Sequence, residues 1–510
     1  MNRYDAVRYP TYAKPETHPG RLAAMARLFG LESASPERSR VLELGCGTGG
    51  NLIPMAYGLP QGRFTGVDAA EGPVADGCRR IRDLGLDNIS LRAMDLMDVG
   101  PEFGKFDYIV VHGVYSWVPA PVRDKILAIC RANLAPNGVA YVSYNAYPGW
   151  HLKNAFRQMM LWHVRGNESP AERIQQAREL LRFLAEAAPP RPVYSAILKE
   201  ALEHQERQND GVLFHDDLGE INEPFLFIDF MERAKPHGLK FLAEADFPDM
   251  AVWDPDSPSG RLLTGMAEDI LLQQQYRDFL VLRRFRQTLL CRTEAPTVLE
   301  PDAETLRRLF VAASTRPQPA EASITSEEPV RFATDQGREL TTPHPLSKAA
   351  FLVLGQEWPR WIPVGELLAR SHACLAEAHG APSQDDDEKR LLGFLLRAYG
   401  TDILHLRSRP CPFVTSPSER PRASALARLQ GVKGHGVTNL KHETVRLDDA
   451  LVHRLLSLLD GTRDRAAIED EMARFIREKG EPGADELLAA LPERIAKNLD
   501  RVAKLALLEA

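Results

Sequence analysis

The chain has 510 residues, more than one hydrophobic core normally holds, so it must divide into several domains. Its 44% hydrophobic and 26% charged residues are typical of a globular protein, and the net charge of -7 does not favour nucleic acid or a membrane surface as partner of the whole chain. Six cysteines without close pairs argue against a metal site and a disulfide framework. With a polar start and no bilayer-length apolar run, they predict a cytoplasmic protein.

The segment from Tyr4 to Pro19 is rich in aromatic residues and broken by prolines, so no regular element is expected there. It precedes an expected helix from Arg21 to Phe29. Two interpretations stay open: an arm that covers a ligand pocket, or an extended tail that packs for stability. The side chains that make the first interpretation attractive are Tyr9, Tyr12, Thr17 and His18.

Residues 41–50, VLELGCGTGG, read as an apolar strand and a glycine-dense turn that leads into a helix. A loop that contacts a ligand through its backbone needs positive φ angles and no Cβ atom, which glycine provides. Gly45, Gly47 and Gly50 also fit a dinucleotide loop, but the nearby Glu43 would repel a pyrophosphate and would instead neutralise an ammonium group. The segment resembles motif I of the class I S-adenosylmethionine (SAM) methyltransferases. That resemblance places Glu43, Gly45, Gly47, Gly49 and Asn51 at the cofactor.

The alternation of strands and helices that follows predicts a buried parallel sheet with helices on both faces. Expected strands are 62–68, 88–96, 106–114 and 139–144, with helices at 73–84 and 121–134 and a turn at 136–138. Asp68, at the carboxyl end of its strand, can accept both ribose hydroxyls or can serve only as a helix N-cap. The class I resemblance implies that Asp95 and Leu96 contact the adenine.

Helical spacing at 152–165, 171–187 and 193–207 then leads the chain away from the sheet. A class I sheet needs two further strands, the last one antiparallel, and 238–245 and 285–291 fit them. Residues 151–236 are therefore interpreted as a helical insertion that acts as a substrate lid. The candidate substrate and lid residues are Tyr9, Tyr12, Tyr147, Trp150, His151, His215, Asp216 and Asn222.

Several motifs together narrow the resemblance: Tyr9–Pro19, the glycine loop, HGVYSWVP at 112–119, YNAYPGW at 144–150, and His215 with Asn222-Glu223-Pro224. They resemble the bacterial methyltransferases that carry a methyltransferase regulatory domain, which include the rickettsial-type protein lysine methyltransferases. The resemblance implies a Rossmann-like class I α/β fold, SAM as methyl donor, S-adenosylhomocysteine as product, and a protein lysine as acceptor.

The last two hundred residues indicate smaller modules. A hairpin is expected at 330–340, with helices at 345–355, 363–371 and 387–399. We therefore expect a methyltransferase core at 1–295 containing the 151–236 insertion, a linker plus winged-helix-like module at 296–425, and a second helical, winged-helix-like module at 426–510. Winged helices also bind DNA, but the basic stretch from Arg407 to Lys433 is rich in Pro and Ser and fits a linker, so docking of a substrate protein is the preferred interpretation.

A lysine acceptor must lose a proton before it attacks, because its unperturbed pKa is about 10.4. Candidate catalytic groups are His112, Tyr115, Tyr144 and Asn145, and Thr17, His18 and His112 are also expected at the cofactor. No metal is expected. Three functions stay open: a protein lysine methyltransferase, a small-molecule or natural-product methyltransferase whose C-terminal modules only mediate homodimerisation, and a SAM-responsive DNA-binding regulator.

Overall fold

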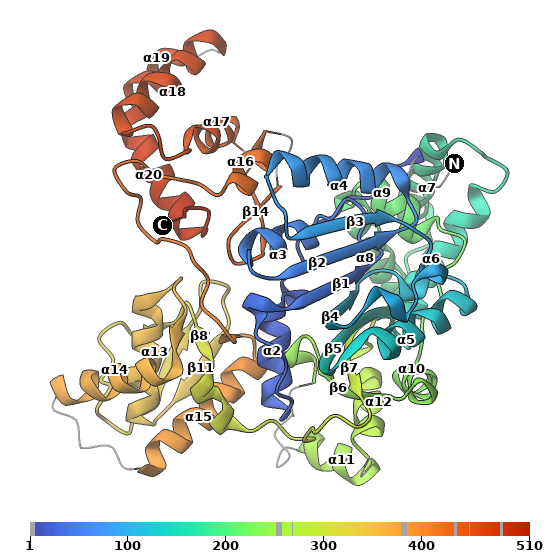
Figure 1. Cartoon of the computed structure of the whole chain (residues 1–510), viewed down its shortest axis with the longest axis horizontal. Helices are drawn as coiled ribbons and strands as arrows, with labels where there is room; N and C mark the ends of the chain where they lie inside the picture. Colours follow the sequence, from blue (N-terminus) through green and yellow to red (C-terminus); the bar gives the residue numbers. More distant parts are fainter. Residues whose placement is uncertain are drawn as a thin grey trace.

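The structure is a computed structural model, and it describes residues 6–250, 258–267, 269–378, 385–432, 436–447, 449–479 and 483–509. A twisted sheet forms the centre, with a helical insertion on one side and two smaller modules on the other (Figure 1). No helix within the described ranges is both long and apolar enough to cross a membrane. Lys433, the end of the predicted basic stretch, lies outside those ranges.

Seven strands form the central sheet in the order β3-β2-β1-β4-β5-β7-β6, and β7 runs antiparallel to both of its neighbours. This confirms the predicted class I architecture, including the two strands that follow the insertion. The strands are β1 (Arg40–Leu44), β2 (Arg63–Asp68), β3 (Ile89–Ala93), β4 (Phe106–Val111), β5 (Leu134–Asn145), β6 (Leu239–Glu244) and β7 (Phe285–Arg292).

Helices cover both faces of the sheet because successive strand side chains point to opposite faces. Val41 joins one buried cluster with α2 (Pro19–Leu28), α3 (Leu52–Gly58) and α4 (Glu71–Asp83). Leu42, the next residue, joins the opposite cluster with α5 (Ala120–Asn133) and α10 (Phe227–Ala234). The unbroken apolar strands of the sequence are therefore explained by burial on both sides.

One detail of the sheet differs from expectation. The turn predicted at 136–138 lies inside β5, which begins at Leu134. Phe106 pairs with Leu134 and Tyr108 with Val139, so residues 135–138 bulge out of the strand pairing. Pro136 cannot donate a ladder hydrogen bond, and a bulge tolerates such a residue where a continuous ladder does not.

The insertion consists of α6 (Trp150–His163), α7 (Pro170–Ala187), α8 (Pro192–Arg207), α9 (Asp210–Val212) and the π-helical turn η6 (Leu213–Asp217). It has a hydrophobic core of its own, formed by side chains such as Phe156, Ile174 and Leu198. The three long helices begin within two residues of their predicted starts. The strong apolar periodicity of these segments accounts for that agreement.

A buried ion network fixes the last two strands to the helix between them, α12 (Ile270–Val281), which follows α11 (Pro258–Met266). Arg286 of β7 is fully buried and contacts Asp278 of α12 at 2.8 Å and Glu244 of β6 at 2.5 Å. Arg283 adds a second contact to Asp278 at 2.7 Å. Buried charges of this kind are tolerated only as pairs, so the network fixes how α12 sits on the sheet.

The middle module contains two three-stranded sheets and three helices. Its elements are β8 (Phe310–Ala312), β9 (Arg316–Gln318), β10 (Val330–Ala333), β11 (Glu339–Thr342), α13 (Pro345–Glu357), β12 (Ile362–Pro363), α14 (Val364–Glu377), α15 (Asp385–Gly400) and β13 (His405–Arg407). Its core is continuous with that of the central sheet through α2 (Figure 1). For example, the Tyr399 ring stacks on Phe247 at 4.9 Å.

The C-terminal module has a separate core of side chains such as Leu455, Met472 and Leu499. It contains α16 (Ala425–Gly431), β14 (Gly436–Thr438), β15 (Thr444–Arg446), α17 (Ala450–Leu458), α18 (Arg465–Lys479), α19 (Ala484–Ala489) and α20 (Leu491–Lys504). The β14–β15 hairpin beside these helices is the wing of a winged-helix arrangement.

Candidate functional site

The glycine loop after β1 has the backbone geometry that its sequence predicts. Gly45, Gly47 and Gly49 have φ angles of 77°, 53° and 71°. A Cβ atom on Gly45 would overlap the Val114 side chain, and one on Gly47 would stand 2.8 Å from Cγ2 of Thr11. Only glycine fits these positions, because they combine left-handed backbone with close neighbours.

Glu43, the acid in front of the loop, is almost completely buried. The Asn51 side-chain amide donates to its Oε1 at 2.7 Å, whereas Oε2 is buried and accepts no hydrogen bond from any described residue. Burial raises the pKa of Glu43 to about 8, against the Asn51 hydrogen bond, and the nearby Asp68 carboxylate raises it further. Such a carboxyl group is completed by a cationic or hydrogen-bonding ligand.

Asp68 stands at the end of β2 and binds the glycine loop directly. Its two carboxylate oxygens accept hydrogen bonds from the Gly47 and Ala70 backbone amides, each at 2.8 Å. A carboxylate oxygen can accept more than one hydrogen bond, so these two bonds do not exclude ribose hydroxyls as further donors. The alternative of a helix N-cap is wrong, because the N-cap of α4 is Ala70 and no side chain caps it. The ribose contact stays a prediction with which this geometry is compatible.

The N-terminal arm (residues 6–18) lies against the loop. Thr11 and Thr48 share a hydrogen bond of 2.5 Å between their hydroxyls, and the Lys14 backbone amide donates to Asn51 Oδ1 at 2.9 Å. Thr17 is fully buried and exchanges hydrogen bonds with Asn51 at 3.0 and 3.2 Å. The arm therefore lies at the site, and the same hydrogen bonds also stabilise its packing there. Both interpretations of the arm are compatible with this geometry.

His18 caps the helix that follows the arm, and its contact with the cofactor stays a prediction. Its Nδ1 accepts from the Gly20 amide at 3.0 Å and so caps α2, and its ring lies 5.2 Å from the ring of His442. Burial lowers the pKa of His18 well below its ordinary value, as do Arg407 and neighbouring basic groups. This side chain therefore fixes the start of α2, directly after the arm.

Asp95, Leu96 and His112 lie at the carboxyl ends of the next strands, as predicted. Asp95 is exposed and its carboxylate accepts from the Met97 amide at 2.9 Å, while Leu96 is buried. His112 Nδ1 is 2.8 Å from the Tyr141 hydroxyl, which donates to Gln287 at 2.8 Å. Burial and the nearby Lys14 ammonium lower the pKa of His112 to about 3, so its ring is neutral. The adenine and cofactor contacts of these residues stay predictions.

A second polar group gathers where the arm meets the insertion. The Tyr9 hydroxyl donates to Asp216 Oδ2 at 3.2 Å, and Asn222 donates to the Asp216 carbonyl at 3.0 Å. Asn145, at the end of β5, donates in turn to Asn222 at 2.8 Å. His215 donates from Nε2 to the Val7 carbonyl at 2.8 Å. Four predicted residues, Tyr9, Asp216, Asn222 and Asn145, thus form one hydrogen-bonded chain, which we call the acceptor network.

Asp216 is the titratable member of the acceptor network. Burial raises its pKa to about 7, and the adjacent Asp217 adds to the rise, while Lys153, Tyr9 and Lys14 oppose it. Asp217 itself is paired with Lys153 at 3.0 Å. Asp216 therefore changes charge near neutral pH, where a proton acceptor is useful. Its place on a π-helical turn is a further feature found often at functional sites.

Tyr115 and Tyr144, expected as catalytic groups, are fully buried. Their rings pack with those of Phe225 and Phe230, and the Tyr144 hydroxyl is bonded to Thr288 at 3.1 Å. Both lie in the cluster between the sheet and α10. Aromatic packing accounts for both side chains, and neither belongs to the acceptor network.

The other predicted substrate residues are dispersed. Tyr147 stacks on the exposed His151 with ring centroids 4.2 Å apart, and Trp150 is buried beneath Lys153, whose ammonium is 4.9 Å from the ring centroid. Tyr12 is half exposed and lines a small cavity between the arm and the C-terminal module. Sequence reasoning missed Lys14, Lys153 and His442. Lys14 and Lys153 lie close to predicted motifs, whereas nothing local singles out His442.

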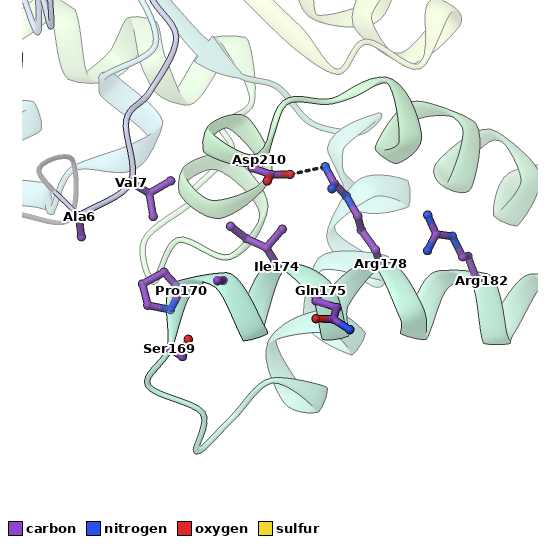
Figure 2. A pocket seen from close by; sticks show the side chains of 10 residues that line it. Ala6, Val7, Ser169, Pro170, Ile174, Gln175, Arg178, Arg182 and Asp210 are labelled. Carbon is purple, nitrogen blue, oxygen red and sulfur yellow. Dashed lines mark ion pairs between the residues drawn. The ribbon is translucent and has the colours of Figure 1, made fainter.

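A hollow of about 620 Å³ lies where α7 meets the start of the arm. Figure 2 shows Ala6 and Val7 at one end and Arg178 and Arg182 at the other, with Arg178 paired to Asp210 at 2.7 Å. Val7 also accepts the hydrogen bond of His215, so the hollow adjoins the acceptor network. Among the described residues, no group of three His, Cys, Asp or Glu side chains could hold a metal ion.

The arrangement fits an amino-acid-bearing nucleoside cofactor. The orphaned Glu43 oxygen suits an ammonium group, the Cβ-free loop allows close backbone approach, and Asp68 suits a ribose. The single arm joins this cradle to the acceptor network through Thr11 and Tyr9. The arm thus contacts both groups of residues from positions two residues apart.

Three family models match the chain: a methyltransferase domain at 41–138, a predicted methyltransferase regulatory domain at 209–292, and the "PKMT, C-terminal winged helix domain" at 419–507. The regulatory-domain match takes in β6 and β7 of the sheet and overlaps the helical insertion only at its end.

Relatives of nearly full length are also found. An uncharacterised protein of Rickettsia prowazekii is 32% identical over 486 residues, covering 94% of this chain and 87% of the relative. A second R. prowazekii protein is 37% identical over 240 residues, covering 47% of this chain and 96% of that protein. Among solved structures, PKMT2 from Rickettsia typhi in complex with AdoHcy (S-adenosylhomocysteine) has a TM-score of 0.86 at 28% identity, covering 98% of this chain and 99% of that one.

Proposed function

This chain belongs to the family of bacterial SAM-dependent methyltransferases that carry a methyltransferase regulatory domain, and from this we propose that it methylates lysine side chains of a protein substrate. The likeness to PKMT2 spans every domain, including the C-terminal module that matches a PKMT family model. Because a fold alone does not set the substrate, the lysine assignment must rest on the site.

The observation that carries the proposal is the acceptor network around Asp216. A lysine enters as an ammonium group and must become a neutral amine, for which a carboxylate that ionises near pH 7 is a suitable proton acceptor. Tyr9 donates to one oxygen of this carboxylate. Asn222 donates to the backbone carbonyl of Asp216, and Asn145 donates to Asn222, so both amides support the residue through its backbone. We propose that Asp216 takes the acceptor proton and that these neighbours hold it in place.

When bound, SAM supplies a methyl carbon whose bond to sulfur breaks as the bond to the acceptor nitrogen forms. For this chain we propose that Glu43 holds the ammonium group of the cofactor, that the glycine loop approaches its methionine part, and that Asp68 holds the ribose. Asp95 and Leu96 would hold the adenine. The enzyme's contribution is then proximity, orientation and desolvation of the amine.

The finer partner assignments are proposals as well. The hollow along α7 is large enough to seat residues that flank the acceptor lysine, and its arginines favour acidic flanks. Exposed apolar side chains of α11 and α12, among them Leu262, Met266 and Leu280, support a homodimer. A cytoplasmic location is supported by six cysteines that all lie in the described ranges as free thiols.

The experiment that tests the proposal is incubation of the pure enzyme with methyl-labelled SAM and a lysate of its host, followed by separation of macromolecules from metabolites. We expect label in protein, and none with an Asp68→Ala variant that cannot hold the ribose. Label that appears only in small metabolites would contradict protein methylation and favour a small-molecule acceptor. Tight SAM binding without any turnover would favour a regulator.

A further inference from the structure

The C-terminal module reaches into the cofactor cradle with one side chain. His442 lies in the loop between β14 and β15 (residues 439–443, here the His442 loop) and is 3% exposed. Its Nε2 lies 2.9 Å from Oδ1 of Asn51, across a sequence separation of 391 residues. Asn51 is the residue that donates to Glu43. Only Asn51 therefore stands between the C-terminal module and the acid of the glycine loop.

The direction of this hydrogen bond follows from the partners of Asn51. Its amide nitrogen donates to Glu43 and Thr17, which fixes Oδ1 as the acceptor. His442 must then donate from Nε2, and burial lowers its pKa to about 3, so it donates as a neutral ring. Oδ1 also accepts from the Lys14 amide, so the arm and the C-terminal module meet on one atom.

The His442 loop is built rigidly enough to deliver that contact. Asn439 Oδ1 accepts from the backbone amides of Lys441 and Glu443 at 3.0 and 2.9 Å, and Leu440 donates to the Ala506 carbonyl of the same module at 2.9 Å. His442 has a φ of 61°, a left-handed conformation that the surrounding bonds must maintain.

The middle module holds the loop from its other side. Arg407, the last residue of β13, donates to the Lys441 carbonyl and lies over the Trp361 ring at 5.2 Å. The Lys441 ammonium lies 5.2 Å from the Trp358 ring centroid and pairs with Glu443 at 2.9 Å. The position of the loop thus depends on both C-terminal modules together.

We propose that His442 is a positioning residue for SAM, which orients Asn51 and through it Glu43, so that seating of the C-terminal modules sets cofactor affinity. The physical reason is that loss of one partner loosens the buried Asn51 amide, and the Glu43 carboxyl group, which Asn51 holds through Oε1, is then oriented less firmly. The proposal rests on the SAM-binding part of the proposed function and is independent of the acceptor.

The test compares two substitutions that differ by one methylene. His442→Asn suits the left-handed backbone but is too short to reach Asn51, whereas His442→Gln places an amide donor near the former Nε2. Titration calorimetry with S-adenosylhomocysteine should give a Kd weakened roughly five- to tenfold for His442→Asn, the loss of about one hydrogen bond, and near-native binding for His442→Gln. Under saturating acceptor, KM for SAM should rise in step while kcat stays close to wild type.

The matched control is Glu443→Gln, which removes the ion pair to Lys441 in the same loop without touching Asn51. It should bind the ligand normally. Equal weakening in this control would assign the effect to loop integrity and overturn the proposal, as would unchanged binding in His442→Asn. A double-mutant cycle with Asn51→Ala decides the case even if single variants are less stable: coupled losses support the contact, and additive losses contradict it. If the wild-type protein itself does not bind S-adenosylhomocysteine, that result would instead contradict the cofactor assignment.

Discussion

Glu43 is a carboxyl group whose surroundings favour its neutral form until a cation arrives. Its pKa of about 8 means that it is largely protonated at neutral pH in the cofactor-free enzyme, with burial as the main cause. Pairing with an ammonium group requires the charged form. With Glu43 as the proposed partner of the cofactor ammonium, we expect cofactor binding to release a proton from this residue.

Because a proton is released on binding, cofactor affinity should increase with pH. Between pH 6 and 7.5 the cofactor ammonium stays mostly charged, since α-amino groups titrate near 7.7–8.0, so each unit of rising pH should tighten the Kd by up to about tenfold. Calorimetry across this range checks the slope, and repetition in buffers of different ionisation enthalpy counts the released proton. Glu43→Gln should bind weakly and without this slope; a slope that survives in Glu43→Gln would exclude the assigned role.

Asp216 leads to a prediction for the rate. Because its pKa is raised to about 7, it is protonated at pH 6 and ionised at pH 8, so kcat/KM for the acceptor should rise through neutral pH as the carboxylate forms. Asp216→Asn keeps the shape of the side chain and removes its charge. It should lower kcat roughly 10²-fold or more and should abolish the rise of kcat/KM through neutral pH. A profile whose limb near pH 7 persists in Asp216→Asn would assign the titration to another group.

At this scale the sequence predicted the groups that belong to compact motifs. Gly45, Gly47, Glu43 and Asp68 could be placed because loop geometry and charge constrain them within a few residues. The surroundings of Tyr115 and Tyr144 could not be predicted in this way, since nearness to a strand end does not reveal which face of the sheet a ring joins. Tyr141 and Tyr144 are three residues apart on one strand and lie in opposite clusters.

The N-terminal arm is the element that joins donor and acceptor sides. Thr11 contacts the glycine loop, and Tyr9, two residues earlier, contacts Asp216. We therefore expect Thr11 to affect cofactor binding and Tyr9 to affect acceptor binding. We expect Thr11→Val to raise KM for SAM and Tyr9→Phe to raise KM for the acceptor, each by roughly tenfold, the scale of one hydrogen bond to a buried or charged group.

Steady-state kinetics with each substrate varied in turn measures the two effects. Each variant is the control for the other, because both change one hydroxyl in the same short segment. Two variants that disturb the same KM would contradict the division of the arm into a donor half and an acceptor half.

Long helices with clear periodicity and the β10–β11 hairpin were predicted from the sequence, whereas several three-residue strands were not. The three long helices of the insertion agree with their apolar spacing. Strands β9, β14 and β15 have only three residues each, which is too short for an alternating pattern to be recognised in the sequence. The bulge in β5 resembled a turn because Pro-Asn-Gly favours both, and only pairing with β4 distinguishes them.

At the scale of the whole molecule, the modules are joined by shared packing and by direct contacts. The middle module shares a core with α2, and His442 of the C-terminal module contacts Asn51, the residue directly after the glycine loop. Such contacts join residues hundreds of positions apart, and a single sequence contains no local signal for them. The winged-helix character of the C-terminal module was predicted correctly, whereas its position against the cofactor cradle required the structure.

The central claim is that the methyl group ends on the side-chain nitrogen of lysine. The most direct measurement labels protein in the lysate with methyl-labelled SAM, hydrolyses it to amino acids in acid and separates the products against mono-, di- and trimethyllysine standards. We expect the label to co-elute with one or more of these standards and to disappear with Asp68→Ala. Label that co-elutes with another methylated amino acid, or that is lost as a hydrolysable ester, would contradict the claim.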